Sequence, residues 1–218
     1  MKDRFLSTGG VILGIIGLIM SLFMLAKTCR SIESNLFEGS GDIGNCKLQG
    51  YMDYDQSSGI YTLSGSGANM WDKTDAFFMA WRKETGNFSL SARIAFEGEG
   101  VNAHRKMGLI IRESLSGDAK YADVCVHGDG LTSLQYRERT GDITKEVVAN
   151  NKAPDYIKIE RIGKRIIMKT AHGTYPKDIT GEIELDFPGT VYIGIFVCSH
   201  EDYVCETVHF SNVQYKKL

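Results

Sequence analysis

Aromatic and polar side chains suited to holding a sugar ring occur in short segments that alternate apolar and polar residues. A sugar ring exposes apolar C–H faces that stack on aromatic rings, and its hydroxyls need hydrogen-bonding side chains such as those of Arg and Gln. In an alternating strand the polar side chains point away from the core, so we expect this set to line one sheet face. The predicted ligand-binding residues are Trp81, Arg93, Lys106, Arg112, Gln135, Tyr136 and Arg137.

Several of these residues also have a purely structural interpretation. Trp81, like the other tryptophan of the chain, Trp71, could be a core residue. The arginines could instead form salt bridges on a sheet surface, where such pairs contribute little to stability. The sequence leaves both alternatives open.

Acidic and nucleophilic residues do not form a catalytic set. A retaining glycosidase needs two carboxylates about 5–5.5 Å apart. The nearest acidic strings are Glu-Ile-Glu-Leu-Asp at 182–186 and Glu-Gly-Glu at 97–99, and we interpret both as solvated acids. Residues 199–202, Ser-His-Glu-Asp, contain a nucleophile, a base and an acid, but neighbours in a strand point to opposite faces and cannot form a triad. We therefore predict that the protein is not an enzyme.

Metal-ligating residues are sparse. Carboxylates at Asp53, Asp55 and Asp129 could contribute to a Ca²⁺ site, but they are too few to define one. The chain has no Cys-x-x-Cys pair and its five histidines are far apart in the sequence, which argues against a structural zinc site. We therefore predict no cofactor, with Ca²⁺ as the alternative.

Two of the five cysteines, Cys198 and Cys205, flank six residues that are typical of a hairpin turn. Two antiparallel strands could place these cysteines opposite each other, and an oxidising compartment would allow them to bond. The sequence predicts a disulfide here, with free thiols as the alternative.

One stretch of the chain could cross a membrane. Residues 9–26 are uncharged and largely apolar, with basic residues on both sides. Eighteen residues at about 1.5 Å each span roughly 27 Å, which is near the thickness of the hydrocarbon core of a bilayer. We predict an uncleaved signal anchor in residues 1–30, with a cleaved signal peptide or a lipoprotein linked through Cys29 as alternatives. All three interpretations export the rest of the chain.

The remainder of the chain has the period of a β protein. In residues 88–96 apolar side chains alternate with mostly polar ones, which is the pattern of a half-buried strand. Similar short runs follow, separated by Gly-rich turn signals. Many short strands at this spacing predict an antiparallel sandwich or barrel over residues 42–218, after a polar linker at 31–41.

Composition limits the class of protein further. With 218 residues, 43% hydrophobic content and only 3 Pro, the sequence describes one leader and one globular domain. Its formal net charge of −2 argues against non-specific nucleic-acid binding.

Seven segments of the chain carry a family resemblance: 42–44, 59–71, 75–81, 86–94, 106–115, 159–163 and 191–200. The fifth segment, for example, begins with Lys-Met-Gly-Leu-Ile-Ile-Arg. In the same order, the seven segments resemble the bacterial concanavalin A-like lectin/glucanase jelly rolls, in particular small modules of exported proteins and modules appended to glycoside hydrolases. The resemblance implies an all-β, two-sheet antiparallel β-sandwich with one concave face, on which sugar-binding relatives place aromatic and polar side chains. Glucanases of this kind carry Glu-x-Asp-x-x-Glu, and residues 182–186 lack its final acid.

Together, the residues and the resemblance predict a non-catalytic, membrane-tethered carbohydrate-binding module. Its domain would be extracytoplasmic, in the periplasm or at the cell surface, or else secreted after cleavage of the leader. The expected partners are a glycan or polysaccharide and the membrane itself. The first alternative is a protein-interaction subunit of an envelope membrane complex, and the second is a glycoside hydrolase.

Overall fold

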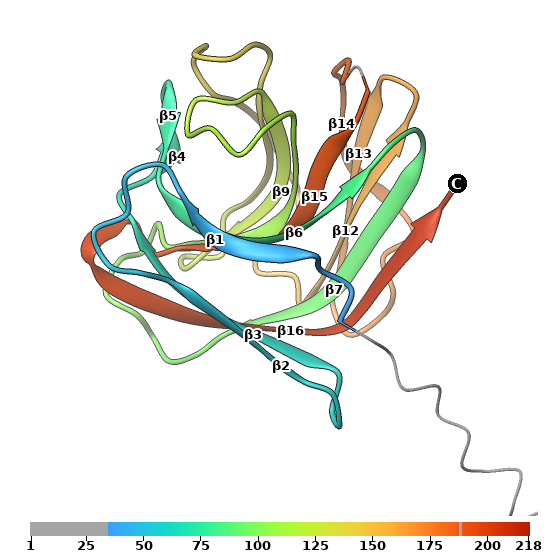
Figure 1. Ribbon diagram of the computed structural model, residues 1–218. Coiled ribbons are helices and arrows are strands. Elements are labelled where there is room, and N and C mark those ends of the chain that lie inside the picture. The colour runs from blue at the N-terminus through green and yellow to red at the C-terminus, as the bar shows by residue number, and fades with distance from the viewer. Residues whose placement is uncertain (1–34, 188) are drawn as a thin grey trace, which may run out of the picture. The chain divides into compact units, whose positions relative to one another are not determined.

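The structure, a computed structural model, describes residues 35–187 and 189–218. These residues form two large antiparallel β-sheets and one small hairpin (Figure 1). The predicted anchor in residues 1–30 lies outside the described residues. Within the described ranges, no helix is long and apolar enough to span a membrane.

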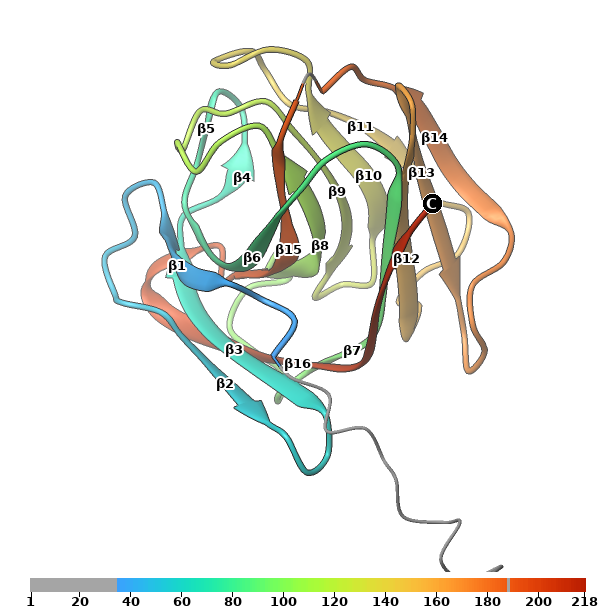
Figure 2. The same ribbon diagram turned by 45° about the vertical axis from the view of Figure 1, so that its right-hand side comes forward.

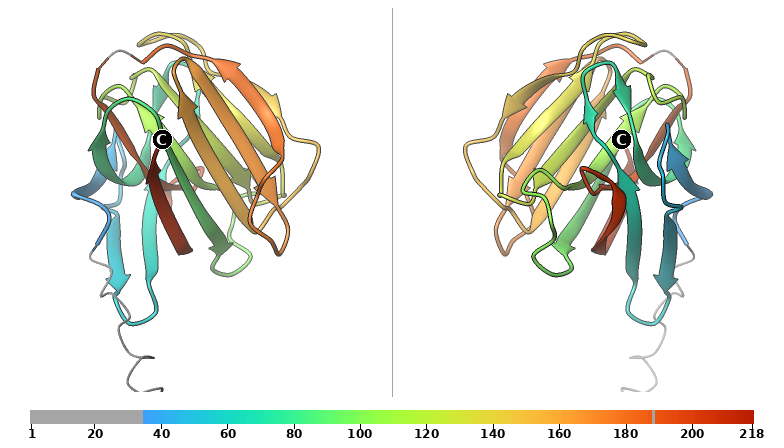
Figure 3. Two further views of the ribbon diagram at one scale, coloured as in Figure 1. Left: turned by 90° about the vertical axis from the view of Figure 1, so that its right-hand side faces the viewer. Right: turned by 90° about the vertical axis from the view of Figure 1, so that its left-hand side faces the viewer.

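Each large sheet has seven strands, and Figure 3 shows the two layers from opposite sides. Sheet A contains, in spatial order, β1 (Gly39–Ile43), β6 (Phe77–Glu84), β15 (Val191–Cys198), β8 (Lys106–Arg112), β9 (Tyr121–His127), β10 (Thr132–Arg137) and β11 (Lys145–Val148). Sheet B contains β14 (Ile179–Glu184), β13 (Arg165–Ala171), β12 (Tyr156–Ile162), β7 (Phe88–Phe96), β16 (Glu201–Lys217), β3 (Ile60–Gly67) and β2 (Tyr51–Asp55). The hairpin pairs β4 (Met70–Trp71) with β5 (Thr74–Asp75).

The main core lies between the two sheets, and sequence alternation decides which side chains enter it. In β7, Phe88, Leu90 and Ala92 are fully buried in this core, whereas Arg93 points to the outer surface of sheet B. Burying one such large apolar side chain contributes roughly 1.5–3 kcal/mol. The predicted period of two in residues 88–96 and the predicted all-β sandwich are therefore confirmed.

The central strands of sheet A are buried on both faces. In β8 and β9, Leu109 and Val124 face the main core, whereas Ile110 and Cys125 belong to a second apolar cluster. Met70 of the β4–β5 hairpin packs into the same cluster. Figure 2 shows the hairpin on the side of sheet A that is turned away from sheet B. The hairpin thus covers the middle of this sheet.

The predicted disulfide between Cys198 and Cys205 is wrong, because the strands that carry them do not form a hairpin. β15 pairs with β6 and β8 in sheet A, whereas β16 pairs with β3 and β7 in sheet B. The buried Cys198 thiol donates to the carbonyl of Gly67, 3.4 Å away, and the Cys205 thiol is exposed in a bulge of β16. Both are free thiols.

The first strand begins earlier than the sequence predicts. β1 starts at Gly39, inside the stretch predicted as a linker at 31–41, and pairs along its whole length with β6. A β-carbon at Gly39 would lie 3.0 Å from the indole ring of Trp81. Glycine is thus what allows this strand to pass against the tryptophan.

Candidate functional site

Five of the seven predicted binding residues lie on the face of sheet A that is turned away from sheet B. We call this the outer face. Trp81 is on β6, Lys106 and Arg112 are on β8, and Gln135 and Arg137 are on β10. The sequence prediction of a shared face therefore holds for these five residues.

Cross-strand pairing arranges the outer face in rows. One row runs across six strands through Trp81, Gly194, Ile110, Asp123, Gln135 and Glu146. The next row contains Lys83, Tyr192, Arg112, Tyr121 and Arg137. Adjacent strands lie about 4.8 Å apart, so each row is a line of side chains perpendicular to the strands.

The two other predicted residues lie elsewhere. Tyr136 packs against the main core between the sheets. Arg93 lies on the outer surface of sheet B, where its guanidinium is 2.9 Å from the carboxylate of Asp155. Because neither residue faces the outer face of sheet A, neither can join a binding site there.

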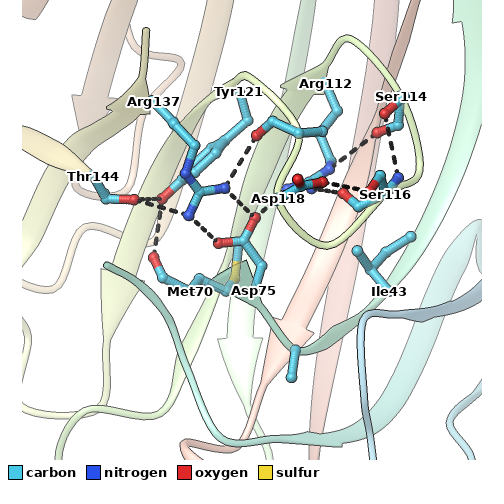
Figure 4. Close-up of polar contacts among 12 residues, drawn as sticks. Ile43, Met70, Asp75, Arg112, Ser114, Ser116, Asp118, Tyr121, Arg137 and Thr144 are labelled. Atoms are coloured by element: carbon cyan, nitrogen blue, oxygen red, sulfur yellow. Dashed lines mark hydrogen bonds and ion pairs between the residues drawn. The ribbon is translucent and has the colours of Figure 1, made fainter. Parts of the chain in front are cut away.

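Arg112 and Arg137 are fully buried and converge on one carboxylate (Figure 4). Asp75, on the hairpin, accepts from Arg112 at 2.7 Å and from Arg137 at 2.9 Å on each of its two oxygens. The remaining donors of the two guanidiniums bond to the carbonyls of Asp72, Ser114, Ser116, Ala119 and Asp142. Every guanidinium nitrogen of both arginines bonds within the protein, and both side chains are fully buried, so the two arginines hold the hairpin and the neighbouring loops.

The hairpin also bonds to the outer face through Met70, at its open end. The Tyr121 hydroxyl donates to the carbonyl of Met70 at 2.9 Å, and it lies 3.2 Å from the hydroxyl of Thr144 (Figure 4). Because Met70 is fully buried in the apolar cluster beneath the hairpin, this part of the outer face is closed to solvent.

The outer face stays open at its β1–β6–β15 side, where two aromatic side chains are partly exposed. Trp81 and Tyr192 meet edge to face, with ring centroids 6.4 Å apart, and they border the covered apolar cluster. The Lys83 ammonium lies 5.7 Å from the Tyr192 ring centroid. The sequence analysis missed Tyr192, although its position in an alternating run at 191–198 was a usable signal.

On the outer face, several buried polar side chains have atoms without a hydrogen-bond partner among the described residues. They include both carboxylate oxygens of Asp123, the Ser133 hydroxyl and the Gln135 side-chain carbonyl. Burial raises the pKa of the Asp123 carboxyl well above its ordinary value, with its neighbours acting in both directions. Burial therefore favours the neutral form of this carboxyl, whereas Lys106 favours the charged form.

The outer face offers two carboxyl groups in one row, Asp123 and Glu146. They lie on β9 and β11, two strands apart, so their backbones are separated by about 10 Å. A retaining glycosidase needs carboxyl groups about 5–5.5 Å apart. In the part of the chain that the structure describes, no group of three or more His, Cys, Asp or Glu could hold a metal ion.

Comparison with known proteins supports the fold class. No family model and no curated protein matches the chain. Among solved structures, a protein of unknown function from Saccharomyces cerevisiae covers 82% of this chain, with 96% of its own length, at 13% identity and a TM-score of 0.61.

Two further solved structures are similar in fold. A carbohydrate-binding module from Bacillus subtilis is 15% identical over 84% of this chain and 98% of its own, with a TM-score of 0.53. A β-1,3-1,4-glucanase derived from a mouse hindgut metagenome is 11% identical over 85% and 95%, with a TM-score of 0.52. The chain therefore has the concanavalin A-like jelly-roll fold, which carbohydrate-binding modules share with glycan-active enzymes.

Proposed function

We propose that this protein is a non-catalytic carbohydrate-binding module. The observation that carries the proposal is the partly exposed Trp81–Tyr192 pair at the open side of the outer face. Aromatic rings that remain accessible on a sheet face offer the apolar surface on which a sugar ring stacks. In this interpretation one sugar stacks on the pair, and Lys83 beside it donates to a ring substituent.

The row that starts at Trp81 limits how far a bound chain extends. Gly194, the next residue of this row, is buried, and a β-carbon there would lie 1.9 Å from the carbonyl oxygen of Ala80 and 3.0 Å from the Met79 side chain. The row then reaches Ile110 and the covered part of the face. A short glycan end, rather than a long chain along the whole row, fits this geometry.

The absence of catalysis is part of the proposal. Asp123 is fully buried, and Glu146 lies two strands away, so the pair does not have the geometry of a retaining glycosidase. If Asp123 were a catalytic acid, Asp123→Asn would abolish hydrolysis of a bound glycan. We expect no hydrolysis by the wild-type protein on any glycan that it binds.

Membrane attachment and export also belong to the proposal. The uncharged residues 9–26 would anchor the protein, and the β-sandwich would lie outside the cytoplasm, where polysaccharides are found. Protease treatment of intact cells or spheroplasts tests this topology, because an extracytoplasmic domain is cleaved without lysis.

Fluorescence of Trp81 tests glycan binding at the proposed position. The chain has two tryptophans, so Trp71→Phe leaves Trp81 as the only indole. We expect the emission of this full-length variant to change when a polysaccharide binds. In the wild-type background, Trp81→Ala should weaken binding by about tenfold, equivalent to about 1.4 kcal/mol.

A matched control separates a specific effect from the loss of any exposed aromatic side chain. Tyr203 is 74% exposed on β16, a strand of sheet B, and Tyr203→Ala should leave the affinity unchanged. Unchanged affinity in a folded Trp81→Ala variant would overturn the proposed site.

A further inference from the structure

A cluster of basic and imidazole side chains lies at one end of the outer face, where β8 begins and β9 and β15 end. Lys106 pairs across the sheet with His127 on one side and with Cys198 on the other. The ring of His104 lies 6.0 Å from that of His127 and 5.6 Å from that of His200, measured between centroids. We call Lys106, His104, His127 and His200 the end cluster.

Lys106 is buried and forms no ion pair among the described residues. Lys106 is only 3% exposed. Its ammonium donates to the side-chain carbonyl of Asn69 at 2.7 Å. No described carboxylate forms an ion pair with it. Burial raises the pKa of Asp123 on the same face, against the opposing effect of Lys106, and neither carboxylate oxygen of Asp123 has a hydrogen-bond partner among the described residues. A buried charge with one neutral partner is costly, so a site of this kind favours a bound anion.

His127 adds an unused polar atom to the same place. Its residue is 5% exposed, and its Nδ1 has no hydrogen-bond partner among the described residues. The pKa of His127 is lowered to about 3, mainly by burial and then by Lys106. The two neighbouring histidines lower it further, and Asp129 acts in the opposite direction. Burial and Lys106 also lower the pKa of His200, against a smaller opposing effect of Glu201.

The two nearby acids, Asp129 and Glu201, bond to groups outside the cluster. One carboxylate oxygen of Asp129 accepts from the backbone N–H of Leu131 at 2.9 Å. A carboxylate oxygen of Glu201 accepts from the side-chain amide of Asn102 at 2.9 Å. Because His104 is exposed and His200 is half-buried, the cluster can be reached from the end of the sandwich.

We propose that the end cluster binds an oxyanion of an acidic saccharide, either a carboxylate or a sulfate. This inference rests on the proposed carbohydrate-binding function and names the class of glycan. The Lys106 ammonium supplies the charge, and the imidazole N–H groups supply donors. The same ammonium disfavours a metal cation at this place. The bound anion would also offset the cost of burying Lys106.

The histidine ring signals of the full-length protein in detergent micelles report on the cluster by NMR. The probes are glucuronate, glucose 6-sulfate, inorganic sulfate and, as the neutral match, glucose. We expect glucuronate or glucose 6-sulfate to shift the signals of His104, His127 and His200, and glucose to leave them in place. His172→Ala and His209→Ala assign the two remaining signals and serve as controls.

Two variants test the charge and the accessible ring. Lys106→Met keeps most of the stem and removes the charge, and should weaken binding of the acidic sugar about tenfold or more. His104→Ala changes an exposed side chain, so it should fold even if the first variant does not, and should weaken binding several-fold. The proposal would be overturned if glucose shifted the histidine signals as much as the acidic sugars do, or if inorganic sulfate alone shifted them. Unchanged binding of the acidic sugar by the folded variants would also overturn it.

The result is distinguishable from a failure of the proposed function. Neutral glycans that change the Trp81 emission of the Trp71→Phe variant, while the histidine signals stay in place, would overturn the anion site and leave the carbohydrate-binding function intact. Silence of both reporters across acidic and neutral sugars would overturn both proposals.

Discussion

We expect removal of the Asp75 carboxylate to lower the stability of the fold strongly, because this carboxylate is the centre of the buried ion-pair network. In Asp75→Ala, two fully buried guanidiniums, Arg112 and Arg137, lose the three hydrogen bonds that they donate to this carboxylate at 2.7–2.9 Å. Breaking a buried pair by removing one partner costs about 3–5 kcal/mol, because the remaining charge stays buried without compensation. For a domain of this size each kcal/mol lowers Tm by about 2–4 °C, so the expected loss is roughly 6–20 °C.

Thermal and urea unfolding followed by circular dichroism measure this loss. The matched control is Glu138→Ala, which removes the acid of an exposed pair with Lys145, whose side chains are 48% and 54% exposed. A surface pair of this kind contributes about 0–1 kcal/mol, so the control should unfold close to the wild type. If Asp75→Ala cost no more than Glu138→Ala, the hairpin would not be held by this network, and our reasoning about the covered face would be refuted.

Two further predictions concern titration and thiol reactivity. Burial alone would raise the pKa of Glu84, but hydrogen bonds from Lys217 and Tyr215 lower it to about 2. The stability that this carboxylate contributes is therefore present above about pH 4.5 and is lost as the pH falls toward 2. Between these pH values the urea midpoint of Glu84→Gln should fall less than that of the wild type, and parallel curves would contradict this. In the native protein, iodoacetamide should label the exposed Cys205 but not Cys198, whose pKa burial raises to about 11. Peptide mapping measures this, and equal labelling would contradict the burial of Cys198.

The strands of the core could be predicted because each carries its own signal. The alternation in residues 88–96 corresponds to β7, and five of the seven predicted binding residues share one face because a period of two fixes the side on which a side chain lies. Alternation does not specify the neighbouring strand, however. The segments β15 and β16 follow each other in sequence but belong to different sheets, which is why the predicted disulfide failed.

The sequence could not predict that the β4–β5 hairpin covers part of the outer face. β4 and β5 have two residues each, too few to show a period. The partners of Asp75 are 37 and 62 residues away in the sequence, and nothing in the local pattern identifies them. The arginines therefore looked like ligand-binding residues, whereas in the structure they hold the hairpin.

The most direct test of the central claim is a binding screen of the full-length protein on a glycan array with acidic and neutral saccharides, with and without Ca²⁺. The wild type and the double variant Trp81→Ala/Tyr192→Ala should be compared after circular dichroism has shown that both are folded. We expect the wild type to bind a defined group of glycans and the double variant to lose that binding. Silence of the folded wild type across the panel, or unchanged binding by the double variant, would contradict the account.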